Sequence, residues 1–318
     1  MNLKKTSVLL LFCASLSSCV AQAWETLVAD FAEQYQELDI EPLHIGYIDN
    51  LEGIQDAEGQ RRQKAVFSSF KAQLENFERS ELELQQQLEY DLLSYYIHLN
   101  EDRLQMEERW ESYRKELLLA AGLAKEPMGK EWYTYYLKAW LDRSVHPDSL
   151  FEFGLRESDR VARSMKAIQE ASELDGAAFQ AYLQSPVFLE EAAEDVEAAI
   201  AEYESFVSPK LLALFPDFEQ TPPVYVRRGT DSRLAQVPAF YRDATFFYNL
   251  FEEPFNLRQV AFLYLHEANP GHHYELSRRD ARELPVLTSL FYHPGYSEGW
   301  AAYIEDLALD TELYRNVY

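Results

Sequence analysis

The sequence predicts a mainly α fold: several helices, with a small β element before the most histidine-rich segment. Only 11 Gly and 13 Pro occur in 318 residues, whereas Glu, Leu, Ala and Gln, which favour helix, are abundant. Apolar residues recur every three or four positions along much of the chain, as one-faced helices require. With 47% hydrophobic residues, the chain can bury a sizeable core in roughly one or two domains. Neither an internal repeat nor a low-complexity linker marks a domain boundary.

The helical periodicity is clearest in the first two thirds of the chain. Gly122 and Pro127 end one of these segments, because both residues interrupt helices. The predicted helices cover residues 81–98, 104–123, 148–174 and 194–214.

The composition changes after Pro216. Residues 224–227 and 244–250 are strand-like, and residues 229–231 between them are typical of a turn. Helix resumes near Asn256, a suitable N-cap, and residues 257–267 are apolar along most of their length. This pattern places His266 and Glu267 at the C-terminal end of a largely buried helix.

The first residues are typical of a targeting segment. Lys4 and Lys5 precede an apolar stretch, residues 7–16, which is too short to span a bilayer. Leu-Ser-Ser-Cys, ending at Cys19, resembles a bacterial lipobox, whereas Ala-Gln-Ala at residues 21–23 resembles an ordinary cleavage site.

We favour lipidation of Cys19, because both cysteines of the chain lie in this segment and Cys19 stands directly after the apolar stretch. Residues 1–19 are then a signal peptide and lipobox, and residues 20–318 form one helical domain. The mature chain begins at Cys19, or at Trp24 after ordinary cleavage. We expect an exported protein, lipid-anchored in the bacterial cell envelope on the periplasm-facing outer membrane; the alternative is a soluble periplasmic protein.

The net charge of −25 argues against nucleic acid as a partner, because two polyanions repel each other. Charged residues on helices are most often solvated surface, so the charge predicts no other partner.

Four of the seven histidines fall between residues 266 and 293. The segment His-Glu-Ala-Asn-Pro-Gly-His-His begins at His266 and differs from the zinc motif H-E-x-x-H, because Pro270 stands where the second histidine would be. In a regular helix His266 and His272 would lie roughly 9 Å apart along the axis. Two nitrogens on one zinc must lie within about 4 Å of each other. A break at Pro270 and Gly271 would bring His272 into reach.

A third ligand is expected from the segment that follows Ser297, which we interpret as a capping residue. Glu298 lies in the first turn, and Glu305 lies two turns further along the same face. His266, His272 and Glu298, with water as fourth ligand, would form a catalytic zinc site in which Glu267 serves as general base. Glu305, Asp306 and Asn269 are candidates for orienting a ligand histidine.

Two segments carry a resemblance to a known family. HEANPGHHYE at residues 266–275 and SEGWAAYIEDLAL at residues 297–309 resemble the paired signature of the bacterial family called domain of unknown function 885. Its members show H-E-x-x-P-G-H-x-x-Q and then E-G-W-A-x-Y-x-E. Residues 225–249 resemble, more weakly, the segment before the first motif.

The resemblance implies a multi-helical fold like that of gluzincin-type zinc metallopeptidases, and members of the resembled family are often exported or lipid-anchored. It makes His266, His272 and Glu298 ligands of one Zn²⁺ and Glu267 the base. The family's pattern leaves the position of His273 variable, so His273 is a neighbour of the site.

Two departures from the family's pattern stand out. Glu275 replaces the usual Gln, and the chain stops at Tyr318 where the family continues with a further helical portion. We therefore expect a domain that is incomplete at its C-terminus. The accessory residues that could replace the missing part in stabilising an oxyanion are Arg233, Tyr241, His293 and Tyr296.

The expected function is a zinc-dependent metallopeptidase that hydrolyses peptides in the cell envelope. An extended peptide could dock on the strand pair near Val224 and Phe246. Two alternatives stay open: an inert or truncated lipid-anchored helical scaffold or binding protein that retains a metal site, and a zinc hydrolase of another amide or ester. Imidazole and carboxylate ligands also admit other divalent ions.

Overall fold

The computed structural model describes residues 21–44, 46–113, 122–291 and 293–315. The predicted lipobox, with Cys19, lies outside these residues. The chain is 67% helical with little strand, so the predicted mainly α class is confirmed. It forms two compact units: unit 1 comprises Met1–Pro147 and Leu284–His293, and unit 2 comprises Asp148–Glu283 and Pro294–Tyr318.

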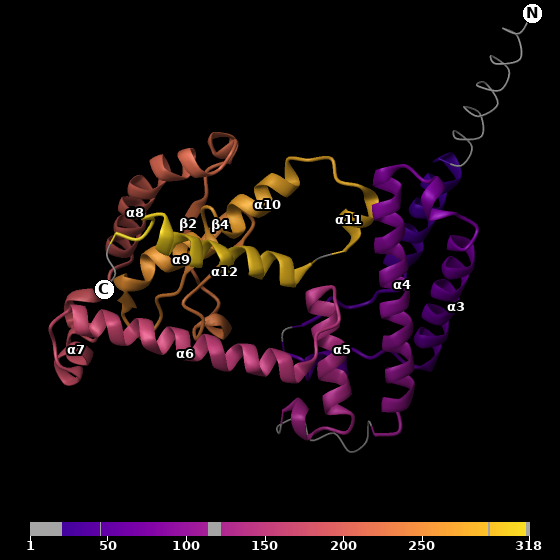
Figure 1. Cartoon of the computed structure of the whole chain (residues 1–318), viewed down its shortest axis with the longest axis horizontal. Helices are drawn as coiled ribbons and strands as arrows, with labels where there is room; N and C mark the ends of the chain where they lie inside the picture. Colours follow the sequence, from indigo (N-terminus) through magenta and orange to yellow (C-terminus); the bar gives the residue numbers. More distant parts are fainter. Residues whose placement is uncertain (1–20, 45, 114–121, 292, 316–318) are drawn as a thin grey trace, which may run out of the picture. The chain divides into compact units, whose positions relative to one another are not determined.

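The regular elements in the described part of unit 1 are all helices (Figure 1). The predicted helices over residues 81–98 and 104–123 are one continuous helix, α4, as far as residue 110, so that boundary was wrong; apolar spacing continues through Leu104 without a cap. Its elements are a helix over residues 21–36, α2 (Asp49–Glu52), α3 (Ala57–Leu74), α4 (Leu84–Trp110), α5 (Gly129–Leu141), α11 (Val286–Leu290) and the short 3₁₀ turns Arg79–Glu81 and Leu123–Lys125.

Local side chains start the two long helices of unit 1. The Asp56 carboxylate accepts hydrogen bonds from the backbone N–H groups of the first turn of α3, and Glu83 forms a capping box with Gln86 at the start of α4. Between the helices lies an aromatic core. Its largest fully buried side chains include Phe31, Phe67, Phe70, Trp110 and Trp132.

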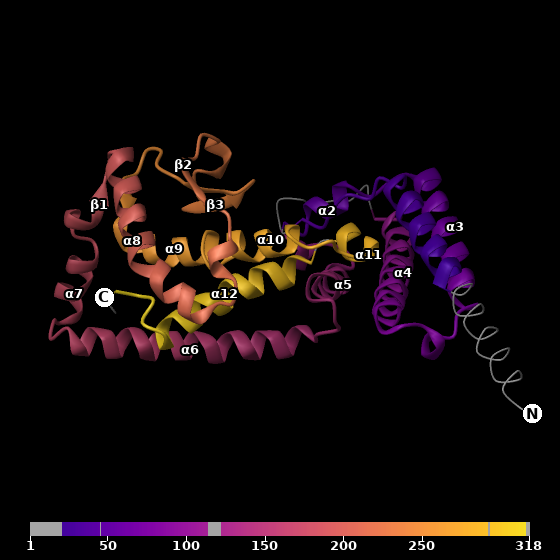
Figure 2. The same cartoon turned by 90° about the horizontal axis from the view of Figure 1, so that it is seen from above.

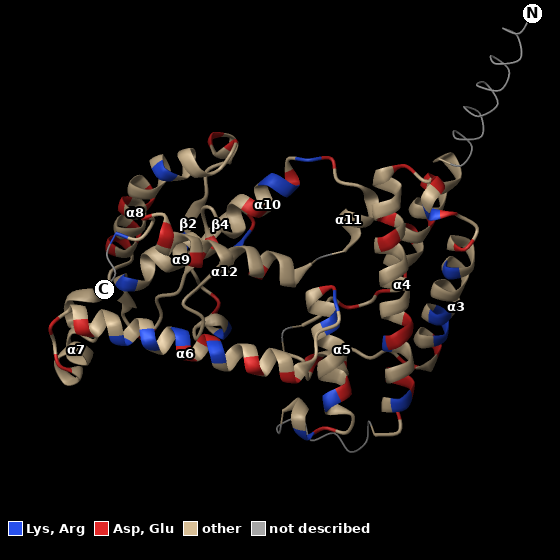
Figure 3. Ribbon diagram, viewed as in Figure 1, with Lys and Arg blue, Asp and Glu red and all other residues tan. Residues whose placement is uncertain are grey.

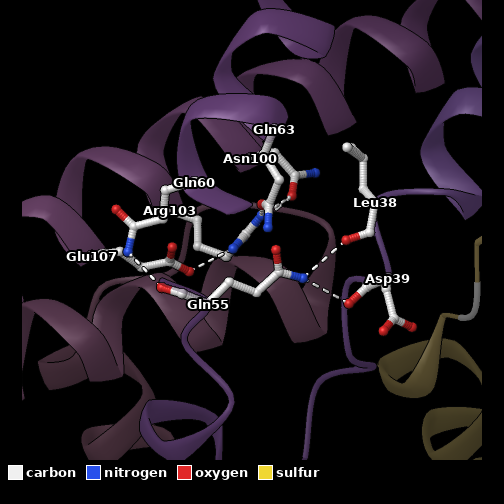
Figure 4. Close-up of polar contacts among 8 residues, drawn as sticks. All are labelled: Leu38, Asp39, Gln55, Gln60, Gln63, Asn100, Arg103 and Glu107. Carbon is white, nitrogen blue, oxygen red and sulfur yellow. Dashed lines mark hydrogen bonds and ion pairs between the residues drawn. The ribbon is translucent and has the colours of Figure 1, made fainter. Parts of the chain in front are cut away.

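One polar cluster interrupts this core. Arg103 on α4 donates hydrogen bonds to Glu107, 2.5 Å away, to Asn100, 3.0 Å away, and to Gln63 on α3 (Figure 4). All three acceptors are buried. A buried guanidinium is tolerable only when acceptors surround it, so this cluster fastens α3 to α4.

Unit 2 contains the remaining helices and the strands. The predicted helices over residues 148–174 and 194–214 are confirmed within three residues. The elements are α6 (Pro147–Ala171), α7 (Gly176–Leu183), β1 (Leu189–Glu190), α8 (Ala193–Leu214), β2 (Tyr225–Arg228), β3 (Ala239–Arg242), β4 (Thr245–Tyr248), β5 (Phe255–Asn256), α9 (Val260–Glu267), α10 (His272–Asp280) and α12 (Pro294–Asp310), with 3₁₀ turns at Pro186–Phe188, Phe218–Gln220, Ser232–Leu234 and Leu257–Gln259.

The main sheet has the strand order β2-β4-β3. β4 pairs in parallel with β2, Tyr225 opposite Thr245, and antiparallel with β3, Ala239 opposite Tyr248. Strands at β2 and β4 were predicted, whereas β3 was missed. Phe246 therefore lies in the central strand, and the two edges of this sheet belong to β2, which follows Val224, and β3.

Helix α9 is the centre of unit 2. It packs against α8, α12 and β3, and Figures 1 and 2 show it among these elements. Leu263, Tyr264 and Leu265 are almost completely buried, because nearly every residue of α9 before His266 is apolar. The helix is therefore held from several sides, which fixes the direction of the side chains at its C-terminal end.

Acidic residues occur along both α4 and α8 (Figure 3). Within the described residues, none of the helices combines the length and the apolar character that a membrane crossing requires.

Candidate metal centre

The motif helix breaks as the sequence predicts. α9 ends at Glu267 and α10 begins at His272, and the Asn269–Pro270 peptide bond between them is cis. A Cβ atom on Gly271 would overlap the carbonyl oxygens of His266 and Leu265, so this position requires glycine.

Trp300 on α12 holds the break from outside. Its indole N–H donates to the carbonyl oxygen of Pro270 at 2.7 Å, and the N–H of His273 donates to Ala268 at 3.1 Å. The backbone groups that leave the helical pattern thus find partners, which stabilises the broken conformation.

The break brings His266 and His272 together, and Glu298 joins them from α12. Glu298 Oε2 lies 3.7 Å from His266 Nε2 and 3.8 Å from His272 Nε2. The two imidazole rings are perpendicular, with centroids 4.9 Å apart. One ligand atom from each residue lies within 4.8 Å of the others. In the described parts of the chain, no other group of three or more His, Cys, Asp or Glu residues is placed to hold a metal ion in this way.

This donor set fits a zinc ion. Two imidazole nitrogens and one carboxylate oxygen are the ligands of many catalytic zinc sites, which keep a fourth position for water. Bonds of about 2.1 Å in tetrahedral geometry place ligand atoms roughly 3.4 Å apart. The Glu298 distances are close to that spacing. The widest separation between ligand atoms is 4.8 Å, so these atoms would have to approach each other by about 1.4 Å on binding.

The second nitrogen of each histidine is engaged elsewhere. His266 Nδ1 lies 2.5 Å from Glu305 Oε1, so Glu305 lies where it can orient this histidine. His272 Nδ1 lies 3.3 Å from Ser297 Oγ. Both rings therefore turn Nε2 toward Glu298.

Ser297 was predicted as the cap of its helix, and this was wrong. α12 begins at Pro294, so Ser297 lies inside the helix and Glu298 is its fifth residue. The Ser297 hydroxyl instead contacts His272 and donates to Glu275 Oε2 at 3.2 Å. Neither contact was predicted, because both depend on the packing of α10 against α12.

The charges of the site are strongly coupled. Burial lowers the pKa of His266, but the carboxylates of Glu298 and Glu305 outweigh burial and raise the pKa to about 10. Hydrogen bonding with His266 lowers the pKa of Glu298 against the effect of burial. Burial also lowers the pKa of His272. Without a metal, a proton on His266 thus neutralises part of the carboxylate charge.

Glu267 is the carboxylate next to this group. Burial raises its pKa to about 7, although His266 and hydrogen bonding from the Tyr241 backbone act in the opposite direction. A carboxylate with a pKa near neutrality can both accept and return a proton, as a general base must.

His273 is fully buried and makes two hydrogen bonds. Its Nε2 lies 2.7 Å from the carbonyl oxygen of Pro222, so Nε2–H donates there. Nδ1, 3.0 Å away from Tyr241 Oη, accepts from that hydroxyl. With both nitrogens occupied, His273 is a neighbour that fastens α10 to β3, and Tyr241 is tied to the site through it.

The other accessory candidates have different surroundings. Arg233 is 88% exposed and pairs with Asp231, two residues away. His293 belongs to unit 1, where its Nδ1 lies 2.8 Å from Asp142 and 3.4 Å from the Tyr96 hydroxyl. Tyr296 is 62% exposed on α12. Asp306 reaches Arg160 at 3.5 Å, and Asn269 is buried in the break.

Comparison with known proteins supports the resemblance noted in the sequence. No curated protein and no solved structure matches the chain. A family model described as "Bacterial protein of unknown function (DUF885)" matches residues 103–318. Because this match covers about two thirds of the chain and both histidine- and glutamate-bearing segments, the chain belongs to the DUF885 family.

Proposed function

We propose that the chain is a zinc-dependent metallopeptidase that hydrolyses peptides with Glu267 as general base. One observation carries the proposal: two histidine Nε2 atoms and the Glu298 carboxylate face one another within 4.8 Å, directly beside a carboxylate whose pKa is about 7. Such a set matches the ligand and base requirements of metal-assisted hydrolysis.

Each residue has a distinct task in this proposal. His266, His272 and Glu298 would hold the zinc, which when bound polarises a carbonyl oxygen and acidifies a water molecule. Glu267 would accept a proton from the attacking water at its carboxylate and return it to the leaving amine. Glu305 would keep His266 in the orientation that directs Nε2 to the site.

The position of β3 favours a peptide as the substrate. β3 is an edge strand of the sheet, and an edge leaves backbone N–H and C=O groups free to pair with an extended peptide. Tyr241 on this strand contacts Glu267 through its backbone. A peptide paired with β3 would therefore run next to the proposed base.

The test combines zinc analysis with activity on a peptide library. Purified protein should hold about one zinc per chain and cleave library peptides. Glu267→Gln should retain the zinc and lose about a hundredfold or more of the activity. The exposed Glu253→Gln serves as matched control and should behave as wild type.

Three results would redirect the proposal. Equal activity of the Glu267→Gln variant and the wild type would remove Glu267 from its role. Absence of zinc under zinc-replete conditions would favour the inert scaffold. Zinc with hydrolysis of esters or other amides, but not peptides, would favour a different hydrolase.

We also propose that the protein works in the cell envelope, anchored through Cys19. The support is the order of Lys4, Lys5, the apolar stretch and Cys19 in the sequence. Metabolic labelling with a palmitate analogue tests the anchor: label lost in Cys19→Ser is expected, whereas an unlabelled protein that begins at Trp24 would indicate a soluble periplasmic form.

A further inference from the structure

A short relay of hydrogen bonds lies behind His272. His272 Nδ1 contacts Ser297 Oγ at 3.3 Å, and Ser297 Oγ contacts Glu275 Oε2 at 3.2 Å. His272 and Ser297 are both buried, and Glu275 is partly exposed. The relay joins α10, which carries His272 and Glu275, to α12, which carries Ser297.

The number of available protons determines which group donates and which accepts in each hydrogen bond of the relay. A serine hydroxyl has one proton, and an ionised carboxylate only accepts. The Ser297 proton therefore goes to Glu275, and Ser297 Oγ is left as an acceptor toward His272. His272 Nδ1 must then carry the ring proton. A neutral imidazole has one N–H, so Nε2 keeps its lone pair and faces Glu298.

His266 has a shorter support, since its Nδ1 meets Glu305 directly. We propose that Ser297 and Glu275 are positioning residues that hold His272 in the tautomer and ring orientation needed for binding a metal through Nε2. The inference rests on the proposed metal site and adds the residues that prepare its second histidine.

The carboxylate of Glu275 fixes the direction of the relay because, when ionised, it cannot donate a hydrogen bond to Ser297. A glutamine at this position could accept from Ser297 through its oxygen, but it could also donate to Ser297 through its NH₂ group. In the second arrangement the Ser297 proton turns to His272 Nδ1, and the ring proton moves to Nε2, where it blocks the metal. An ionised glutamate permits only the first arrangement.

The experiment measures zinc affinity by competition with a chelator of known affinity. Ser297→Ala should weaken zinc binding by about 10–100-fold, the usual effect of removing a partner of a ligand histidine. Glu275→Gln should weaken it by a smaller factor, because one of its two arrangements still supports binding. Ser297→Thr keeps the hydroxyl and should stay near wild type. Ser277→Ala on the same helix α10 is the matched control and should stay within about twofold.

A second readout separates tautomer control from simple structural support. ¹⁵N NMR of His272 in zinc-free protein should show Nδ1 protonated in the wild type and a mixture of tautomers in Glu275→Gln and Ser297→Ala. Far-UV circular dichroism of the zinc-free variants checks folding. If Ser297→Ala does not fold, Glu275→Gln still decides the matter, because Glu275 is only partly buried.

Two results would overturn the relay: wild-type zinc affinity in both Ser297→Ala and Glu275→Gln, or a wild-type His272 protonated at Nε2. These results differ from failure of the proposed function. A protein that binds zinc with the expected variant effects but cleaves no peptide would keep the relay and lose the peptidase. A wild-type protein that binds no zinc would overturn both.

Discussion

A cluster of polar side chains lies in each unit, around Arg103 in unit 1 and around His266 and His272 in unit 2, and the two clusters differ in their balance of donors and acceptors. Around Arg103 in unit 1, one guanidinium supplies the protons and Glu107, Gln63 and Asn100 accept them. Around His266 and His272 in unit 2, the groups that face one another are two imidazole Nε2 atoms and a carboxylate. The first cluster contains its own cation, Arg103, whereas the second needs a metal cation or a proton from outside. A surplus of acceptors, rather than burial alone, distinguishes a candidate ligand site from a structural polar cluster.

The largest expected effects come from removing the central residue of each cluster. Arg103→Ala leaves the Glu107 carboxylate buried without its ion-pair partner, which should destabilise unit 1 by about 3–5 kcal/mol. Zinc content should not change. Denaturant unfolding measures the first effect through tryptophan fluorescence, because Trp24, Trp110, Trp132 and Trp140 lie in unit 1.

His266→Ala should give the opposite pattern. It removes one of three ligands, so zinc content should fall from about one per chain to near zero, with little change in the unfolding of unit 1. Metal analysis after gel filtration measures it. Loss of zinc in Arg103→Ala, or retention in His266→Ala, would contradict the division between a structural and a ligand cluster.

The next effect concerns the backbone that makes the second cluster. Gly271→Ala places a Cβ against the carbonyl oxygens of His266 and Leu265, and backbone cannot move aside as a side chain can. We expect a loss of about 1–3 kcal/mol and weaker zinc binding. Hydrogen exchange across residues 260–280 measures the local loss. Gly154→Ala on α6 meets no atom within 4 Å and should be neutral or stabilising by up to about 1 kcal/mol.

The sequence was sufficient where the physical cause is local. The one-faced periodicity of residues 148–174 and 194–214 predicted α6 and α8 closely, because each helix is determined by its own apolar spacing. The mismatch between a six-residue spacing and the reach of one metal predicted the break at Pro270 and Gly271. The same geometric argument paired His266 with His272, and the structure brings these two rings together.

The sequence was insufficient where a partner lies far away in the chain. β3 has four residues and no clear alternation, and it is a strand because β4 pairs with it. Serine is a residue type typical of a helix cap, but α12 begins at Pro294. The Ser297 hydroxyl contacts His272 instead. The two-unit organisation was not predicted either, because residues 284–293 return to unit 1 without any change in composition.

A smaller effect is the pH dependence of zinc binding, because in the zinc-free protein a proton on His266 takes the place of the metal charge. The pKa of His266 is raised to about 10, so at pH 8 zinc must displace about one proton, and apparent affinity should rise about tenfold per pH unit up to about pH 10. At pH 8 Glu267, with a pKa of about 7, is already mostly ionised. Calorimetry in two buffers of different ionisation enthalpy counts the proton.

The raised pKa of His266 also predicts how the stability of the zinc-free protein changes with pH. For zinc-free protein, the stabilisation from protonated His266 is complete below about pH 6.5 and is lost as the pH rises toward 10. Glu305→Gln removes one of the carboxylates that raise this pKa, so it should reduce both the proton release and the pH dependence. Unchanged proton release in this variant would show that Glu305 does not set the charge of His266.

The smallest expected effect concerns Arg233, whose positive charge would suit an oxyanion but whose side chain is exposed and paired with an acidic residue. Arg233 was a candidate for stabilising an oxyanion, yet its side chain is 88% exposed and pairs with Asp231. An exposed pair between residues two positions apart is weakened by solvent and salt. Arg233→Ala should therefore change zinc content and peptide hydrolysis by less than about twofold, since surface substitutions outside a site have small effects. A loss of tenfold or more in hydrolysis, with zinc retained, would show that Arg233 leaves Asp231 to contact the substrate. The charge of Arg233 would then predict its role better than its exposure and its pairing with Asp231 do.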